Sequence, residues 1–232
     1  MSALTALQNA SVRLISRKPT TFFSSTATFE TEMTNLLNDV AVDICGSADW
    51  QGLTKIHTFT GDGTTTAFDK PDDYDRMLLG QAMADGASWF WNYTNVPDMN
   101  TWIAIQNGFY LGATPPGWWM LFGDQFQFAP PPASGARAMF PYVSNLIARD
   151  NTGTPKLAFT TDTDTFVLDE RLLTLGVIWR WREMKNLEYG ADQANFDKAF
   201  SEAAARDKGS RVIRKGTPRF GNIPIAWPWE LG

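Results

Sequence analysis

Few side chains in the sequence have the types and spacing that catalysis requires. The only histidine, His57, lies beside Phe59 in a segment that predicts a β-strand, so we expect a packed or surface residue rather than a general base. A catalytic triad also needs a nucleophile near its histidine, and the sequence has no GxSxG motif that would mark such a serine. The phosphate-binding pattern GxxxxGK(S/T) is missing as well. The sequence signal for an enzyme is therefore weak, and we single out no catalytic or cofactor-binding residue.

The remaining candidates for metal binding are one cysteine and a cluster of aspartates. Cys45 stands alone, which excludes an internal disulfide and any zinc site built from several cysteines. The stretch "DKPDDYD" brings four carboxylates close together, at Asp69, Asp72, Asp73 and Asp75. Their spacing does not match an EF-hand, and acidic turns are common after strands, so we interpret the stretch as a solvated turn without a metal ion. A glycosidase-like carboxylate pair stays open, because acidic pairs are abundant in any acidic protein.

The stretch "VIWRWREMK" places aromatic and basic side chains in alternation. Trp179, Arg180, Trp181 and Arg182 could stack on nucleic-acid bases, bind a sugar or pack within a helix. The apolar residues around them recur at three- and four-residue spacing, which predicts an amphipathic helix of about five turns. Helically spaced aromatic residues usually belong to a core. We therefore expect the helical core to include Leu172, Leu175, Trp179 and Trp181.

Composition and charge restrict the class of protein. With 232 residues, of which 44% are hydrophobic and 19% charged, the chain can bury a large core, which argues against wholesale disorder. The net charge of −5 argues against a protein that binds nucleic acid over its whole surface. The N-terminal stretch lacks the apolar run of a signal peptide, and no later stretch is apolar for long enough to span a membrane. We expect a protein that is made and used without export.

Both ends of the chain show helical spacing. Residues 29–44 repeat apolar side chains every three or four positions, with Thr26 or Thr28 as the expected N-cap. A shorter helix is predicted over residues 4–15. After a break at "EYGAD", a last helix is predicted from the four-residue spacing of Phe196, Phe200 and Ala204.

The middle of the chain, from about residue 55 to 157, has the period of β-strands. "KIHTFTGDGTTTAFDKP" predicts a hairpin that turns at residues 61–63, where two glycines permit positive φ. "GWWMLFGDQFQFAPPP" predicts a second hairpin, in which phenylalanines alternate with glutamines and only one face is buried. "ARAMFPYVS" predicts another strand. The sequence therefore indicates a small antiparallel β domain.

The last segment, "KGSRVIRKGTPRFGNIPIAWPWELG", has neither helical nor strand periodicity. Basic residues precede an apolar end that contains two prolines, which block a helix or a central strand. One interpretation is a tail folded back on its own domain. The other is an arm that docks on a partner and becomes ordered there. In that case the interface residues are Arg211, Arg214, Arg219, Phe220, Ile223, Ile225, Trp227 and Trp229.

These elements predict an α+β protein. Residues 1–54 and 158–210 are expected to form a helical bundle, and residues 55–157 an inserted antiparallel β domain. Residues 211–232 are expected to form an extended C-terminal arm.

Several motifs in this arrangement belong to a known pattern. They are "LGVIWRW" at 175–181, "LEY" at 187–189 and "AAARDKGSR" at 203–211. With the β stretches at 58–77 and 123–132, they make the chain resemble the head-to-tail adaptor (connector) proteins of tailed bacteriophages. The helical motif is the more specific, because the hairpin motif recurs in other phage structural proteins.

The resemblance implies a structural virion protein without enzymatic activity. Such adaptors assemble into a homo-oligomeric ring, commonly a dodecamer, beneath the portal protein at the neck of the virion. The ring extends the DNA channel and docks the next tail or nozzle protein. A mildly acidic ring suits this role, since DNA must slide through the channel without specific binding. The resemblance implies no cofactor and no membrane, and synthesis in the host cytoplasm.

Two alternative functions stay open. A tail-completion or stopper protein of the same neck would differ by whether it binds the portal directly. A carbohydrate-binding β module would use exposed tryptophans such as Trp89, Trp91, Trp118 and Trp119. Because adjacent strand residues face opposite ways, each of these pairs would offer only one ring to a sugar.

Overall fold

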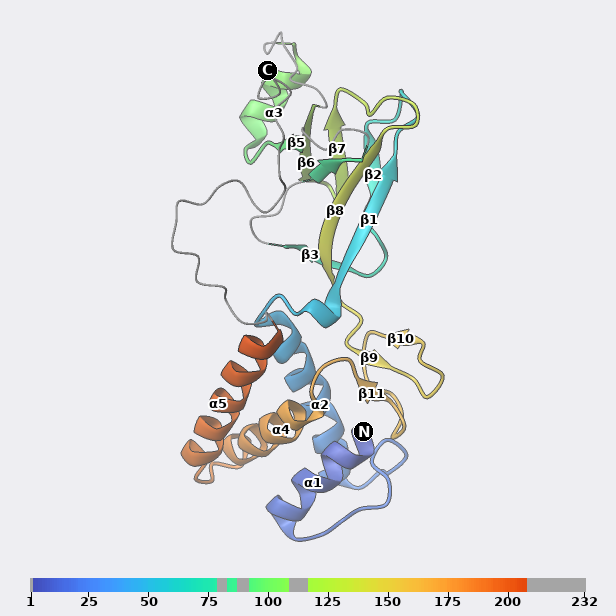
Figure 1. The fold of residues 1–232 in the computed structure, drawn as a ribbon. Coiled ribbons are helices and arrows are strands. Elements are labelled where there is room, and N and C mark those ends of the chain that lie inside the picture. Colours follow the sequence, from blue (N-terminus) through green and yellow to red (C-terminus); the bar gives the residue numbers. More distant parts are fainter. Residues whose placement is uncertain (1, 79–82, 87–91, 109–116, 208–232) are drawn as a thin grey trace, which may run out of the picture.

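The computed structural model describes residues 2–78, 83–86, 92–108 and 117–207, and it has an α+β fold (Figure 1). One part of the molecule is helical, with α1 (Ala3–Ile15), α2 (Thr28–Gly46), α4 (Glu170–Met184) and α5 (Gly190–Asp207). The other part is a large sheet. The expected C-terminal arm, residues 211–232, lies outside the described residues.

The helix α4 lies at the centre of the helical part, and α1, α2 and α5 all pack against it (Figure 1). The predicted apolar stripe of α2 is confirmed, since Met33, Leu37, Val40 and Ile44 are all buried in this core. The predicted N-cap of α2 is wrong. Ala27 occupies that position without a side-chain hydrogen bond, because the helix already begins at Thr28. The helix α4 is also about one turn shorter than its apolar spacing predicts, with 15 residues.

The large sheet has the strand order β1-β8-β4-β5-β6-β7-β2, and β3 pairs with β8 outside this path. Its strands are β1 (Thr54–Thr60), β2 (Ala67–Asp69), β3 (Tyr74–Met77), β4 (Met83–Asp85), β5 (Asn92–Asn95), β6 (Trp118–Phe122), β7 (Gln125–Ala129) and β8 (Arg137–Ser144). A smaller sheet has the order β10-β9-β11, formed by β9 (Ala148–Arg149), β10 (Pro155–Lys156) and β11 (Thr165–Phe166). This smaller sheet lies beside the helices (Figure 1).

The first predicted hairpin is wrong. The strand β1 pairs along its whole length with β8, and β2 pairs with β7 at the other end of the sheet. Gly63 has the positive φ (87°) that was predicted for the turn, whereas Gly61 serves a close backbone approach, since its N–H donates to the carbonyl oxygen of Ala136 (2.8 Å). A Cβ on Gly61 would lie 2.4 Å from the carbonyl oxygen of Ala133. The turn therefore holds the chain against the loop before β8 and sends it to a distant strand.

The second predicted hairpin is confirmed. The strands β6 and β7 pair in antiparallel register around Gly123 and Asp124, which both have positive φ (58° and 64°). This turn geometry matches the right-handed twist of the strands. Phe126 and Phe128 are fully buried, as their alternation with glutamines predicts.

The prediction of a purely antiparallel sheet is wrong, because β5 and β6 run parallel. Parallel neighbours need a crossover connection, and the helix α3 (Met99–Gln106) lies between these two strands in the chain. Helix α3 was not predicted from the sequence. Its start is marked by Asp98, whose side chain accepts a hydrogen bond from Thr101 N–H (2.8 Å) as an N-cap.

Aromatic side chains fill the inner face of the large sheet. Phe126, Phe128 and Phe140 are fully buried there and Phe59 is nearly so. The Phe59 and Phe68 rings, from the two ends of the sheet, lie 5.1 Å apart. The sheet is therefore curled, so that its first and last strands share one aromatic core.

Polar side chains join the sheet to the helical part. Arg76 of β3 donates to the carbonyl oxygen of Ala48 (2.9 Å) and forms an ion pair with Asp49 (3.1 Å) just after α2. Asp73 accepts hydrogen bonds from Tyr142 (2.8 Å) and Ser144 (2.7 Å) of β8, and pairs with Lys55. Burial alone would raise the pKa of Asp73, but these bonds lower it to about 2. The contacts of Asp73 lie within the sheet, whereas those of Arg76 reach the helical part, and we call the contacts of Arg76 the junction.

The contacts of Asp73 also correct the interpretation of the aspartate cluster. Asp69, Asp72 and Asp75 are exposed, as a solvated turn predicts, whereas Asp73 is a partly buried acceptor for several donors. In the described residues, no group of three or more histidine, cysteine or acidic side chains is placed to hold a metal ion.

A second pair of aspartates fixes the start of α1. The backbone oxygens of Asp162 and Asp164 accept hydrogen bonds from Leu4 and Ala3 N–H (3.1 and 2.7 Å), which satisfies donors that a helix leaves unpaired. The fully buried carboxylate of Asp164 pairs with Lys156 (2.7 Å) and accepts bonds from the backbone of Thr160 and Thr161. Burial opposes ionisation of this carboxyl, but the bonds prevail and lower its pKa to about 2.

We predict that Asp164→Asn lowers the free energy of unfolding at pH 7 by about 1 to 3 kcal/mol, because a buried charge-assisted network loses its ion pair. The pKa of Asp164 is depressed, so its stabilisation is complete above the ordinary value of 3.8 and is lost as the pH falls toward about 2. The variant should therefore lose less stability than the wild type over that pH range. Urea denaturation at several pH values measures both effects.

Asp150→Asn is the matched control. Asp150 makes similar turn bonds, to the backbone N–H groups of Thr152 and Thr154 (both 2.8 Å), but these bonds are exposed. We expect a change within about 0.5 kcal/mol. Equal effects of the two substitutions would show that burial of Asp164 contributes nothing.

Candidate functional site

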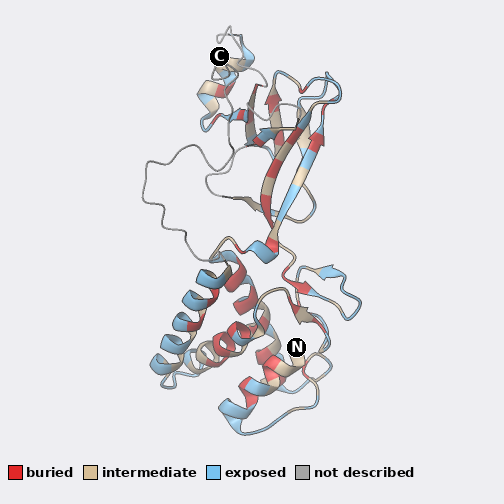
Figure 2. Cartoon of the chain, in the orientation of Figure 1, coloured by how far each residue is buried: buried red, intermediate tan, exposed pale blue. Residues whose placement is uncertain are grey.

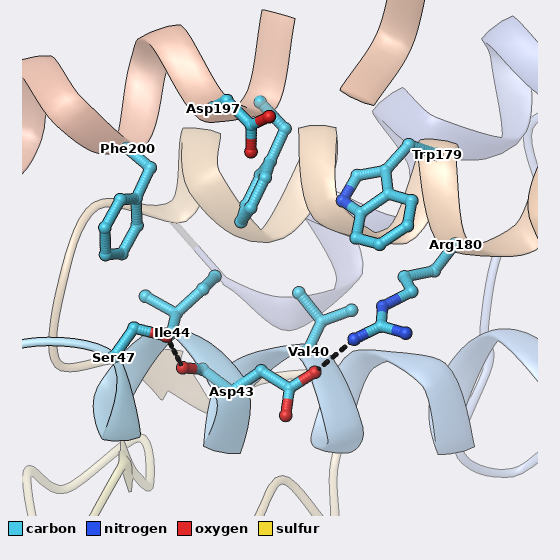
Figure 3. Close-up of a pocket in the computed structure, with 9 residues that line it drawn as sticks. Val40, Asp43, Ile44, Ser47, Trp179, Arg180, Asp197 and Phe200 are labelled. Carbon is cyan, nitrogen blue, oxygen red and sulfur yellow. Dashed lines mark hydrogen bonds and ion pairs between the residues drawn. The ribbon is translucent and has the colours of Figure 1, made fainter. Parts of the chain in front are cut away.

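A cavity of about 350 Å³ opens between α2, α4 and α5, at the end of α4 that carries "WRW" (Figure 3). Its apolar lining comes from all three helices, with Val40, Ile44, Trp179, Phe196 and Phe200. Its polar lining consists of Asp43, Ser47, Arg180 and Asp197. We call this cavity the α2–α5 pocket.

Arg180 forms the charged rim of the α2–α5 pocket (Figure 3). Its guanidinium lies 2.7 Å from the Asp43 carboxylate and 3.7 Å from that of Glu183. It also lies 4.5 Å from the centre of the Trp179 ring, a cation–π geometry. Because Arg180 and Asp43 are 40% and 57% exposed, water screens their pair, which contributes little stability. The pair orients these side chains more than it stabilises the fold.

Trp179 forms one wall of the pocket rather than a fully buried part of the core. Its ring centre lies 6.1 Å from that of Phe196 and 6.4 Å from that of Tyr189. The side chain is partly buried, yet its indole Nε1 is shielded from water and has no hydrogen-bond partner among the described residues.

Gly176 allows the three helices to approach one another. A Cβ at this position would lie 2.4 Å from Val40 Cγ1 and 3.3 Å from the Phe196 ring. The second residue of "LGVIWRW" therefore has to lack a side chain. Sequence reasoning missed this contact, since Val40 and Gly176 are far apart in the chain.

The four predicted core residues of α4 differ in how far they are buried. Leu172 and Leu175 are buried in the helical core, whereas Trp179 and Trp181 are partly buried. Trp181 packs edge-on against Phe29 (5.9 Å between ring centres). The predicted arm residues Arg211, Arg214, Arg219, Phe220, Ile223, Ile225, Trp227 and Trp229 lie outside the described residues.

The groups with catalytic potential are not assembled in the α2–α5 pocket. His57 lies in β1, with its ring 4.7 Å from Phe59, and burial lowers its pKa although Asp73 acts in the opposite direction. Cys45 is buried, and burial raises its pKa to about 12, so the thiol stays protonated at neutral pH. The pocket offers apolar walls and a charged rim, which suit an aromatic or aliphatic side chain of a partner.

The tryptophans of β6 do not form a sugar platform. Trp119 is buried against Phe126 (5.7 Å between ring centres), and only Trp118 of this pair is partly exposed. Trp89 and Trp91 lie outside the described residues. No helix in the described part of the chain is long and apolar enough to cross a membrane.

An α+β fold that carries an apolar pocket with a charged rim fits a structural protein that binds other proteins. The chain belongs to the SU10 adaptor protein family, whose family model matches residues 1–219, in agreement with the resemblance of its motifs to phage adaptors. Membership implies a structural, non-enzymatic protein of the phage virion that interacts with portal and tail proteins. Among curated proteins, none matches the chain.

We predict that Gly176→Ala lowers the free energy of unfolding by about 1 kcal/mol or more. The added methyl gains up to about 1 kcal/mol of helix propensity but must displace Val40, and overpacking costs about 1 to 3 kcal/mol. Thermal and urea denaturation measure the difference.

Gly46→Ala is the matched control, because a Cβ at this helical glycine meets nothing within 4 Å. Its stability should stay unchanged or rise by up to about 1 kcal/mol. If Gly176→Ala were as stable as Gly46→Ala, the close approach of α2 and α4 would not depend on the glycine.

Proposed function

We propose that this protein is a head-to-tail adaptor that forms a ring, of dodecameric symmetry, beneath the portal. The ring extends the DNA channel and docks the next tail component. The observation that carries the proposal is the family match, because it spans both the helical part and the sheet. The structure supports it through the shape of the subunit and the distribution of its charges.

The subunit has two separately packed cores that lie at opposite ends of the molecule (Figure 2). One core belongs to the helices and the smaller sheet, and the other to the curled sheet. The junction joins them through Arg76, which contacts Ala48 and Asp49 just after α2. A subunit of this shape can bind one neighbour with its helical end and another with its sheet end, as a link between head and tail requires.

The charge of the chain suits a channel. A formal net charge of −5 disfavours tight binding of DNA, so a genome can pass without being held. The basic arm, residues 211–232, is proposed to dock on the portal or a neighbouring subunit through Ile223, Ile225, Trp227 and Trp229. In this proposal its basic residues are captured first by an acidic surface and its apolar end is buried afterwards.

We predict that the isolated protein is monomeric or weakly associated and that portal templates its ring. Analytical ultracentrifugation of a mixture with cognate portal should show both proteins in one large species. Portal mixed with the Gly46→Ala variant is the control for a neutral substitution. The lack of any portal binding would contradict the adaptor function and favour a stopper that binds elsewhere in the neck.

We further predict that truncation after Ser210 leaves the melting temperature nearly unchanged but weakens attachment to portal or to neighbouring subunits. Aromatic anchors of an interface often contribute about 2 kcal/mol or more each. Trp227→Ala should act in the same direction, and Glu230→Gln serves as its control. A truncated protein that unfolds readily would show instead that the tail completes its own core.

A further inference from the structure

A second depression, of about 850 Å³, lies between α1, α4 and α5. Its apolar floor includes Leu175 and Val12, and Val12 is 48% exposed. Four basic side chains surround this floor, namely Arg13, Lys18, Arg171 and Lys198. Glu170 and Glu202 also line it. We call this depression the basic groove.

The basic side chains of the groove are unusual within this acidic protein. Elsewhere in the described residues the lysines and arginines form ion pairs, as Arg180 does with Asp43, or donate a hydrogen bond, as Arg137 does to Gly86. Among the described residues, the basic side chains with neither an ion pair nor a side-chain hydrogen bond are Arg13, Lys18, Arg149, Arg171 and Lys198. All of these except Arg149 line the groove. The groove therefore offers unsatisfied positive charge around an apolar floor.

Helix α2 carries four acidic residues and no basic residue. Three of them are ion-paired, Glu30 with Arg17, Glu32 with Lys185 and Asp43 with Arg180, which leaves Asp39. Asp39 is exposed and has no ion pair or side-chain hydrogen bond among the described residues. Val42, on the same outer face, is 57% exposed. We call Asn35, Asp39, Val42 and Asp43 the acidic face of α2.

The basic groove and the acidic face lie on different sides of the subunit. Both depressions are lined in part by α5. The groove is lined by its residues Asn195, Lys198, Ala199 and Glu202. The α2–α5 pocket is lined by its residues Phe196, Asp197 and Phe200. With 3.6 residues per turn, these two sets lie on opposite flanks of α5. Asp43 lines that pocket, so the acidic face of α2 adjoins it. Helix α5 thus separates the basic groove from the acidic face.

We propose that the basic groove of one subunit receives the acidic face of α2 from the next copy of this chain in the ring. A closed ring needs a heterologous interface, in which two different surfaces of each subunit complement each other. Here Asp39 provides the charge that the groove lacks, and Val42 provides an apolar contact for its floor. This inference rests on the proposed ring and names the surfaces that would close it.

A second copy fits the groove better than DNA does. A phosphate backbone would be attracted by Arg171 and Lys198 but would find no partner for the exposed Val12 or for Glu202. The acidic face of α2 offers both charge and an apolar side chain. An acidic segment of portal would fit the same chemistry, and the experiment below separates these occupants.

Two charge-reversed proteins test the pairing. In the first, Arg171→Glu and Lys198→Glu make the groove acidic. In the second, Asn35→Lys and Asp39→Lys make the face of α2 basic. Each protein alone would set like charges against each other, whereas in an equal mixture every groove would meet an opposite face. Arg149→Glu is the control, because Arg149 is an exposed, unpaired basic residue outside the groove.

The assembly of each protein is followed by sedimentation velocity, both at high concentration without portal and at low concentration with portal. We expect self-association at least tenfold weaker for each charge-reversed protein alone, recovery in their mixture, and no change for Arg149→Glu. Mixed rings on portal should contain the two proteins in equal amounts. Melting temperatures close to that of the wild type would show that both variants are folded.

Rings formed by either variant alone, or a mixture that stays as weak as its components, would overturn the pairing even if portal binding persists. Loss of DNA affinity or of portal affinity in the groove variant, with self-association intact, would assign the groove to DNA or to portal and also overturn it. If the wild type self-associates but does not bind portal, the proposed function is contradicted. In that case, recovery of self-association in the mixture still supports the pairing. No association of the wild type in either condition would overturn both.

Discussion

The close approach of α2 to α4 at Gly176 is the constraint on which the helical part depends. With Val40 Cγ1 only 2.4 Å from where a Cβ would stand, any side chain at this position would have to displace Val40. This contact lets Arg180 reach Asp43 and brings Phe196 of α5 over the same position. The α2–α5 pocket exists because three helices converge on a residue that has no side chain.

The second requirement is that the helical part and the sheet keep a fixed relation. The junction provides partly buried polar contacts between them, in which Arg76 donates to the carbonyl oxygen of Ala48 and pairs with Asp49. Charge-assisted bonds of this kind are directional, so they set an orientation as well as a contact.

Local patterns in the sequence predict much of the fold, and distant contacts account for what they miss. The apolar stripe of α2 and the Gly-Asp turn between β6 and β7 depend on neighbouring residues, so periodicity and turn chemistry are sufficient for both. The pairing of β1 with β8 joins residues about 80 positions apart, and no local signal marks it. The parallel pair β5 and β6 requires α3, whose only clear sign is the cap at Asp98. In the candidate site, "LGVIWRW" indicates a helix, but the reason for its glycine lies in Val40, on another helix.

The measurement that tests the account most directly is a cryo-electron microscopy reconstruction of the neck of the virion. The account predicts a ring of this chain in direct contact with portal, with DNA or an open channel along its axis. Within that ring, the acidic face of α2 should lie against α1 and α5 of the adjacent subunit. A neck in which this chain lies away from portal, or in which neighbouring copies do not touch through their helices, would contradict it.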